Sequence, residues 1–274
     1  MTSRLEDTCA GRYSTSMSKP SPSHVARSVR TPERGHIYFA YRPKLDVTVV
    51  RGPDDVQRLY MILNPRGRDS YRLLVVGEKR LPAPDGDRRT WAFVDKVSSN
   101  PEDVEDELDP KSYLTRTRGE RHRPPARPAG EGVYAIVRHR GHPHLVYVLE
   151  LPREPGEVQR GLKIAREGNY IVVVKNPKTP SEPGLGLDET RRARFPRGLA
   201  QRFRGRRFIN LDPPDFLDHE GAEIVLIATG ADVHELGLEL DREHEDEETA
   251  AIFEDLRLEK SLHPIAPLLK GTWE

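Results

Sequence analysis

An order of landmarks that occurs twice is the feature that most constrains what this chain can fold into. The landmarks are a glycine-led run with a tyrosine (Tyr38 and Tyr134), a Val-Gln-Arg triplet (from Val56 and Val158) and a tyrosine that opens an apolar run (Tyr71 and Tyr170). Their offsets are 96, 102 and 99 positions. Offsets that drift so little are expected when insertions fall in loops between strands that stay aligned. The pattern predicts an internal duplication.

Each half shows short apolar runs separated by Gly, Pro and Asp turn signals, which indicates strands. The expected strands are residues 36–41, 45–50, 56–63, 71–76 and 91–97, then 133–139, 145–151, 158–164, 170–175 and 223–229. No helical pattern separates them, so antiparallel pairing is favoured. Cap-like sequences at 99–102 and 229–232 predict a helix after each half. We therefore predict an α+β fold of two similar antiparallel β-rich halves, each followed by a helix, in a pseudo-twofold arrangement.

This interpretation divides the chain into regions. Residues 1–33 are rich in Ser, Thr, Pro and Arg and are predicted to be a disordered leader. The first β-rich half spans 34–110, a basic Pro-rich connector spans 111–131, and the second half spans 132–274. The second half contains a basic insertion at 176–222 and ends in an acidic helix. An elaboration of one half alone is a better candidate for function than a shared framework.

Composition excludes several classes of function. The 44 basic and 44 acidic residues cancel, so no global field favours nucleic acid or an anionic membrane, and any electrostatic function must be local. The single cysteine, Cys9, excludes a disulfide framework and a cysteine metal site. No apolar run is long enough for a membrane-spanning helix, and no secretion signal is recognisable. We expect a cytoplasmic protein with no membrane partner.

The most basic run of the sequence lies inside the insertion. It holds eight arginines and no acid: Arg191, Arg192, Arg194, Arg197, Arg202, Arg204, Arg206 and Arg207. Phe195 and Phe203 interleave with them and are expected to stack on bases or to support the arginines. Guanidinium groups bind phosphate oxygens in pairs, so the run is typical of a nucleic-acid surface. The same run also fits a solvated helix whose arginines pair with acids elsewhere, and the sequence leaves that alternative open.

Two further charged segments bear on function. Between 111 and 127 there are six basic residues and one acid, and Arg116, Arg118 and Arg121 are predicted to add phosphate contacts. Between 235 and 255 there are ten acids and one arginine, which predicts an acidic helix. Its acids are either a solvated face or a surface that folds back on the arginines of the insertion and competes with an external polyanion.

A metal-dependent hydrolase or nuclease is an alternative from a different class. Asp95 and Asp212 lie near the ends of predicted strands or in loops, and His139 and His142 flank a predicted two-residue hairpin turn at Arg140-Gly141. Such side chains activate a metal-bound water when they share one site. The alternative requires the two carboxylates and a histidine to converge within a few ångströms.

The prediction that we favour is binding of a polyanion, specifically nucleic acid, through phosphate-backbone contacts of the insertion. It needs no cofactor and no metal, because phosphate loops, nucleophile elbows and helical zinc motifs are all absent from the sequence. A third hypothesis is a scaffold whose acidic and basic surfaces fit a protein partner or a second copy. It predicts a salt-sensitive oligomer without affinity for polyanions.

Overall fold

The computed structural model describes residues 30–83, 85, 88–117, 119–181, 186–230, 240 and 249–273. The strands are β1 (Arg30–Pro43), β2 (Val56–Pro65), β3 (Tyr71–Val76), β4 (Arg89–Ser98), β5 (Lys111–Thr115), β6 (Gly119–Arg123), β7 (Arg127–His139), β8 (His142–Leu151), β9 (Glu167–Lys175), β10 (Phe208–Asn210) and β11 (Glu223–Ala228). The helices are α1 (Glu102–Leu108), α2 (Glu157–Leu162), α3 (Arg197–Arg202), α4 (Ala251–Asp255) and α5 (Ala266–Leu269), with 3-10 turns η1 (Pro53–Asp55), η2 (Glu189–Arg191) and η3 (Pro214–Asp218). Most of the predicted leader, residues 1–29, lies outside the described residues.

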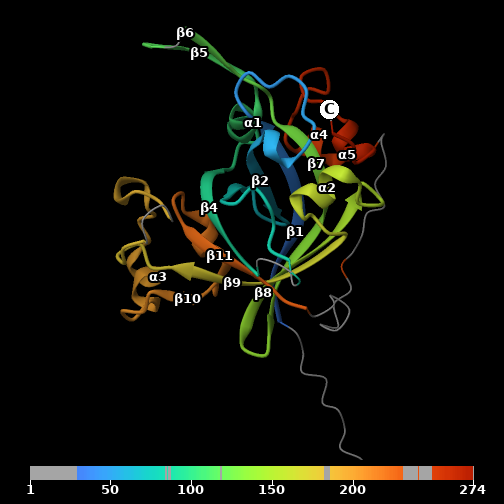
Figure 1. Cartoon of the computed structure of the whole chain (residues 1–274). Coiled ribbons are helices and arrows are strands. Elements are labelled where there is room, and N and C mark those ends of the chain that lie inside the picture. The colour runs from blue at the N-terminus through green and yellow to red at the C-terminus, as the bar shows by residue number, and fades with distance from the viewer. Residues whose placement is uncertain are drawn as a thin grey trace, which may run out of the picture.

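Eight of the strands close into an antiparallel barrel (Figure 1). Around the barrel the order is β4-β3-β2-β1-β7-β8-β9-β11, and pairing of β11 with β4 completes the ring. The predicted antiparallel pairing is confirmed. β10 continues the edge of β9 where β8 ends, because β8 pairs with residues 167–171 of β9 and β10 pairs with residues 173–175.

The predicted α+β fold of two similar halves is wrong. Strands from both parts of the sequence form one ring, and the longest helix of the described residues, α1, has only seven residues. The first Val-Gln-Arg triplet opens β2, whereas the second lies in α2. Gly156 N donates to Gln159 Oε1 at 2.9 Å, and Val158 and Leu162 are buried one helical turn apart, so capping and burial select a helix. The helix expected after the second half begins within residues 231–239, which lie outside the described residues.

Several local predictions are confirmed. β3 spans the predicted residues 71–76, and a helix, α1, forms at the predicted place with Val104 and Leu108 buried. The predicted capping box does not form, because the N-cap is Pro101 and no side chain caps the helix. His139 pairs with His142 across a two-residue turn, Arg140-Gly141, in which both residues have positive φ. No strand forms at 45–50, where the chain turns towards η1.

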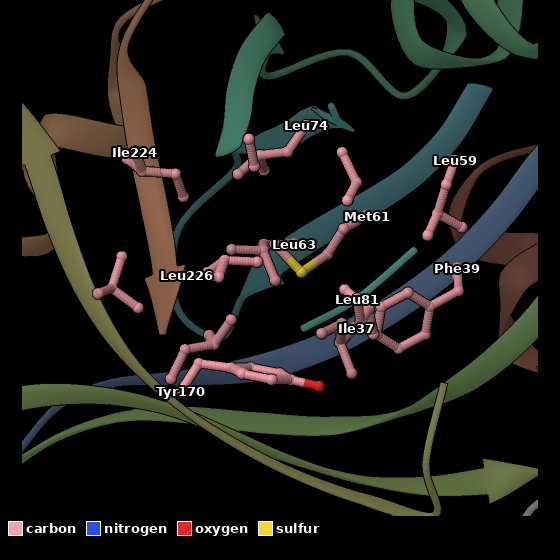
Figure 2. Close-up of a cluster of buried hydrophobic side chains, with 14 of the residues drawn as sticks. Ile37, Phe39, Leu59, Met61, Leu63, Leu74, Leu81, Tyr170, Ile224 and Leu226 are labelled. Carbon is pink, nitrogen blue, oxygen red and sulfur yellow. The ribbon is translucent and has the colours of Figure 1, made fainter. Parts of the chain in front are cut away.

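Alternate side chains of the barrel strands point inward and fill the barrel. Figure 2 shows Phe39 of β1 and Met61 and Leu63 of β2 lying in one cluster with Leu226 of β11. None of these four is more than 1% exposed. Because the interior is filled by side chains, any site for an outside ligand lies on the outer faces or at the ends of the barrel.

Helices α1, α4 and α5 cover the outer face of β1, β2 and β3 with a second core. Its main contributors are Tyr38, Ala40, Tyr60, Ile62, Leu73, Val104, Leu108, Ile252, Phe253 and Leu268. Figure 1 shows these helices gathered at one end of the barrel, away from α3 and β10.

A buried ionic cluster closes one end of the barrel interior. Arg72 of β3 donates to the two carboxylate oxygens of Glu33 at 2.6 and 3.0 Å and to Asp218 at 2.7 Å. Tyr134 OH also donates to Glu33, at 2.9 Å. Burial lowers the pKa of Arg72, but the ion pair and hydrogen bonds with Glu33 outweigh it and raise the pKa above its ordinary value. Because Asp218 ends η3, the cluster also fixes the end of the insertion to the barrel.

A second polar cluster holds α4 against the barrel. Asp255 at the end of α4 accepts hydrogen bonds from Tyr38 OH and from Asn64 Nδ2, and His36 Nδ1 lies 3.3 Å from the same carboxylate oxygen. Burial alone would raise the pKa of Asp255. The hydrogen bonds from His36, Tyr38 and Asn64 outweigh burial, so the pKa of Asp255 lies below its ordinary value of 3.8.

Replacing Asp255 with asparagine is expected to lower the free energy of unfolding by about 1 kcal/mol at pH 7, because the charged acceptor is lost. A lowered folded-state pKa contributes stability above the unfolded value, and this contribution is lost as the pH falls through the folded value. The difference between wild type and variant should therefore stay constant down to pH 5 and close below about pH 3.8. Urea unfolding at several pH values measures it. Glu254→Gln, at an exposed neighbouring position of α4, is the control.

Candidate functional site

Aromatic side chains hold the insertion to the end of the barrel. Phe203, at the end of α3, is 2% exposed and belongs to the barrel core. Its ring centroid lies 5.8 Å from that of Phe195 and 5.6 Å from that of Phe216. Phe195 also contacts Phe216, at 5.1 Å, and His219, at 5.5 Å. Of the two roles considered for Phe195 and Phe203, this packing fits support of the arginines.

A buried ion pair fixes the first part of the insertion. Lys175 Nζ of β9 lies 2.7 Å from Glu223 Oε2 of β11, and the two side chains are 0% and 1% exposed. Leu187 N donates to the other carboxylate oxygen of Glu223 at 2.9 Å. Arg192 Nε donates to Leu187 O at 3.0 Å, and its Nη1 lies 3.4 Å from Pro177 O. Arg192 therefore braces the loop with its guanidinium group and is not a free cation.

Three arginines of the insertion line one open cavity of about 410 Å³, which we call the first arginine cavity. Its lining residues are Val173, Arg202, Arg204, Arg206, Phe208, Ile209, Asn210 and Asp212. Arg204 and Gly205 have positive φ values of 46° and 75°, so the chain turns tightly between α3 and β10. This turn brings the arginines on either side of Gly205 to the same cavity.

The first arginine cavity has an excess of unpaired positive charge. Within the part of the chain that the structure describes, Arg204 and Arg206 are exposed and make no hydrogen bond or ion pair through their side chains. Arg202 Nη1 lies 3.3 Å from the backbone oxygen of Asp212. The carboxylate of Asp212 already accepts from Arg138 at 2.9 Å. The cavity can therefore accept an anion without breaking an ion pair of the two central arginines.

A second cavity, of about 520 Å³, lies between β4 and the insertion and has mixed charge. It is lined by Phe93, Val94, Asp95, Leu187, Thr190, Arg191, Arg192, Arg194, Asp218, His219, Glu220 and Gly221. Arg191 lies 3.5 Å from Asp95, so part of its charge is compensated. Arg194 is exposed and makes no side-chain ion pair within the described ranges. We call this hollow the second arginine cavity.

The remaining arginines of the run, Arg197 and Arg207, line neither cavity. Arg197 is exposed at the start of α3. Arg207 is exposed, and its guanidinium carbon lies 5.5 Å from the ring centroid of Phe208. The other arginines of the run line two different cavities, and they differ in whether their guanidinium groups already have partners.

Three aromatic residues outside the predicted site connect the two cavities: Phe208 interleaves with the arginines in the sequence, whereas sequence reasoning missed Trp91 and Phe93. Trp91 and Phe93 are two residues apart on β4 and share its outer face, and Phe208 comes from β10. The ring centroid of Trp91 lies 6.4 Å from that of Phe93 and 5.9 Å from that of Phe208. The available signal was the Trp-x-Phe spacing in a predicted strand, because residues two apart lie on one face. No feature of the sequence indicates that β10 brings Phe208 next to Trp91.

The arginines predicted in the connector are placed elsewhere. β5 and β6 form a two-stranded hairpin that projects from the opposite end of the barrel from β10 (Figure 1). Arg121 lies 3.0 Å from Asp46, so its charge is paired, and Arg116 is exposed near the hairpin turn. Arg118 lies outside the described residues. The structure therefore does not gather the two described connector arginines, Arg116 and Arg121, with those of the insertion.

The residues of the hydrolase alternative do not come together. Asp95 lies in the second arginine cavity, where it pairs with Arg191 and lies 3.7 Å from Arg58. Asp212 lines the first cavity. His139 and His142 face each other on the β7–β8 hairpin. Among the residues that the structure describes, no group of three or more His, Cys, Asp or Glu side chains is arranged to hold a metal ion.

Most of the predicted acidic helix lies outside the described residues, including Glu235, Glu239 and the acids between 241 and 248. Glu254 and Asp255 are described, and Asp255 contacts β1 and β2 as part of α4.

Within the described ranges, no helix has both the length and the apolar character that crossing a membrane requires. Comparisons of the chain with protein-family models, with curated proteins and with solved structures find no match.

Proposed function

We propose that this protein binds nucleic acid through its phosphate groups, with Arg204 and Arg206 of the first arginine cavity making the central contacts. The observation that carries the proposal is the pair of exposed guanidinium groups on one open cavity without a described acidic partner. A guanidinium group binds two phosphate oxygens at once, and it stays charged at every physiological pH.

A polymer fits this arrangement better than a small anion does. The second arginine cavity offers Arg194 as a further exposed cation. A nucleic acid presents phosphates at regular intervals, so one chain can occupy both cavities. Contacts of this type position a nucleic acid without selecting its sequence. A cytoplasmic location, which we propose from the single cysteine, suits such a partner.

Neutralising two arginines is expected to weaken binding and to reduce its salt dependence. In the double variant Arg204→Gln/Arg206→Gln, two phosphate contacts are lost. The slope of log K against log salt concentration should then fall in magnitude by about 1.4 for a single strand and about 1.8 for a duplex. Fluorescence anisotropy of a labelled 20-mer oligonucleotide between about 50 and 200 mM salt measures this slope.

The matched control is Arg51→Gln/Arg153→Gln, which removes the same charge from two exposed arginines that line neither cavity. It should leave the slope unchanged. The proposal fails if the wild-type protein does not bind the oligonucleotide, or if the two double variants lose the same salt dependence. A salt-sensitive oligomer without oligonucleotide binding would support the scaffold hypothesis in its place.

A further inference from the structure

We infer that the nucleic acid is single-stranded and that its bases stack on Trp91, Phe93 and Phe208 while its phosphates occupy the two arginine cavities. This inference rests on the proposed function and names the class of nucleic acid that the same site takes. We call these three side chains the aromatic row.

The aromatic row connects the two cavities. Phe208 lines the first arginine cavity and Phe93 lines the second. Trp91 contacts both rings, at centroid distances of 5.9 and 6.4 Å. A chain that passes from one cavity to the other along the row therefore meets an aromatic ring between two groups of arginines. Single-strand binding proteins combine basic grooves with aromatic rings in this manner.

The row lies on the outside of the barrel. On β4 the neighbours Thr90 and Ala92 are at most 1% exposed, whereas Trp91 and Phe93 are partly exposed. Phe208 is partly exposed as well, in contrast to the core residue Phe203. On β4, strand alternation explains the difference in exposure, because the barrel core takes every second side chain. The row is thus apolar surface that the barrel interior does not use.

Beneath Trp91 the sheet carries two valines, whereas Phe93 and Phe208 lie in register with the two members of the buried ion pair, Glu223 and Lys175. Trp91 pairs in register with Val225 of β11, and Val225 pairs with Val173 of β9. Val225 is 7% exposed, and Val173 lines the first arginine cavity. These two valines lie on the outer face with Trp91, because residues that pair in register point to the same side of a sheet. An unpaired base laid over this surface would bury apolar area on both sides of the contact.

Stacking selects unpaired bases. In a duplex the faces of the bases are already stacked on one another, and exposing one costs a few kcal/mol of unstacking. A duplex can therefore satisfy the arginines but not the aromatic row. A single strand can satisfy both, so it should bind more tightly than a duplex of the same length and charge.

Tryptophan fluorescence provides a direct test. The chain has two tryptophans, and the second, Trp273, packs against Tyr41 with ring centroids 5.4 Å apart. In the Trp273→Phe background, the emission reports on Trp91 alone. Adding a single-stranded (dT)20 oligonucleotide should change this emission, whereas inorganic polyphosphate, which has phosphates but no bases, should bind without changing it.

Substitution of the rings provides the second arm. Phe208→Leu keeps an apolar side chain at β10 but removes the ring. Tyr113→Leu, which removes an exposed ring from the β5–β6 hairpin, is the control. Loss of one stacked base predicts about a 5- to 150-fold weaker affinity for (dT)20 in Phe208→Leu. Its affinity for polyphosphate should be unchanged, and thermal unfolding verifies that both variants are folded.

The outcomes separate this inference from the proposed function. Tighter binding of (dT)20 than of the matched duplex, a Trp91 signal and a selective loss in Phe208→Leu support it. Equal affinity for single strand and duplex, with Trp91 emission unchanged, would overturn the stacking inference and leave phosphate binding intact. If neither (dT)20, duplex nor polyphosphate binds, both the inference and the proposed function are wrong.

Discussion

Replacing Arg72 with methionine should lower the free energy of unfolding by about 3–5 kcal/mol, which is a large share of the stability of a domain this size. Arg72 is fully buried, and the side chain of its partner Glu33 is only 5% exposed. The variant leaves that carboxylate in the barrel with Tyr134 OH as its remaining hydrogen-bond donor among the described residues. An unpaired buried charge costs more than the lost ion pair itself contributes.

Chemical denaturation at pH 7 measures the loss as a shift of the midpoint with an unchanged slope. Arg68→Met is the matched control, because Arg68 also contacts Asp218, at 3.3 Å, but is 49% exposed. An exposed pair of this kind contributes at most about 1 kcal/mol. Equal losses in the two variants would show that the cluster at the end of the barrel has no special role.

The second large effect is expected from Lys175→Met, which should also cost about 3–5 kcal/mol. The variant leaves Glu223, 1% exposed, without its counter-charge between the sheet and the insertion loop. Because Leu187 N donates to the same carboxylate, the loop should detach from the sheet more often. We therefore expect faster proteolysis within the loop as well as a lower midpoint in denaturant.

Two further variants sharpen this second test. Lys178→Met removes an exposed lysine three positions along the chain and should change stability by less than about 0.5 kcal/mol. The double variant Lys175→Met/Glu223→Leu replaces the whole pair by apolar side chains and should recover most of the loss. If the double variant is no more stable than Lys175→Met, an uncompensated charge is not the cause of the instability.

Local structure was predictable where one short segment holds all the relevant information. The bounds of β3, the buried pair Val104 and Leu108 on α1, and the turn at Arg140-Gly141 all follow from periodicity and turn chemistry. The same reasoning was wrong for residues 158–164. A capping interaction of Gln159 and burial of residues one turn apart make that segment helical although its sequence resembles a strand.

The candidate site was predictable only in part. The run of arginines was visible in the sequence, but its division into free and occupied side chains was not. Arg192 braces the loop and Arg191 faces Asp95, whereas Arg204 and Arg206 are left without a described partner. Whether a given arginine of the run already has a partner depends on groups that lie far away along the chain.

The sequence by itself determined the alternating strands, their antiparallel pairing and the concentration of positive charge in the insertion, because each depends on neighbours within one segment. Only the tertiary structure decided that the strands close into one barrel and that Trp91 and Phe208 meet on its outer face. Both outcomes depend on pairing between distant strands. The stability of such pairings comes from packing and from the entropy of closing long loops, neither of which any short stretch of sequence contains.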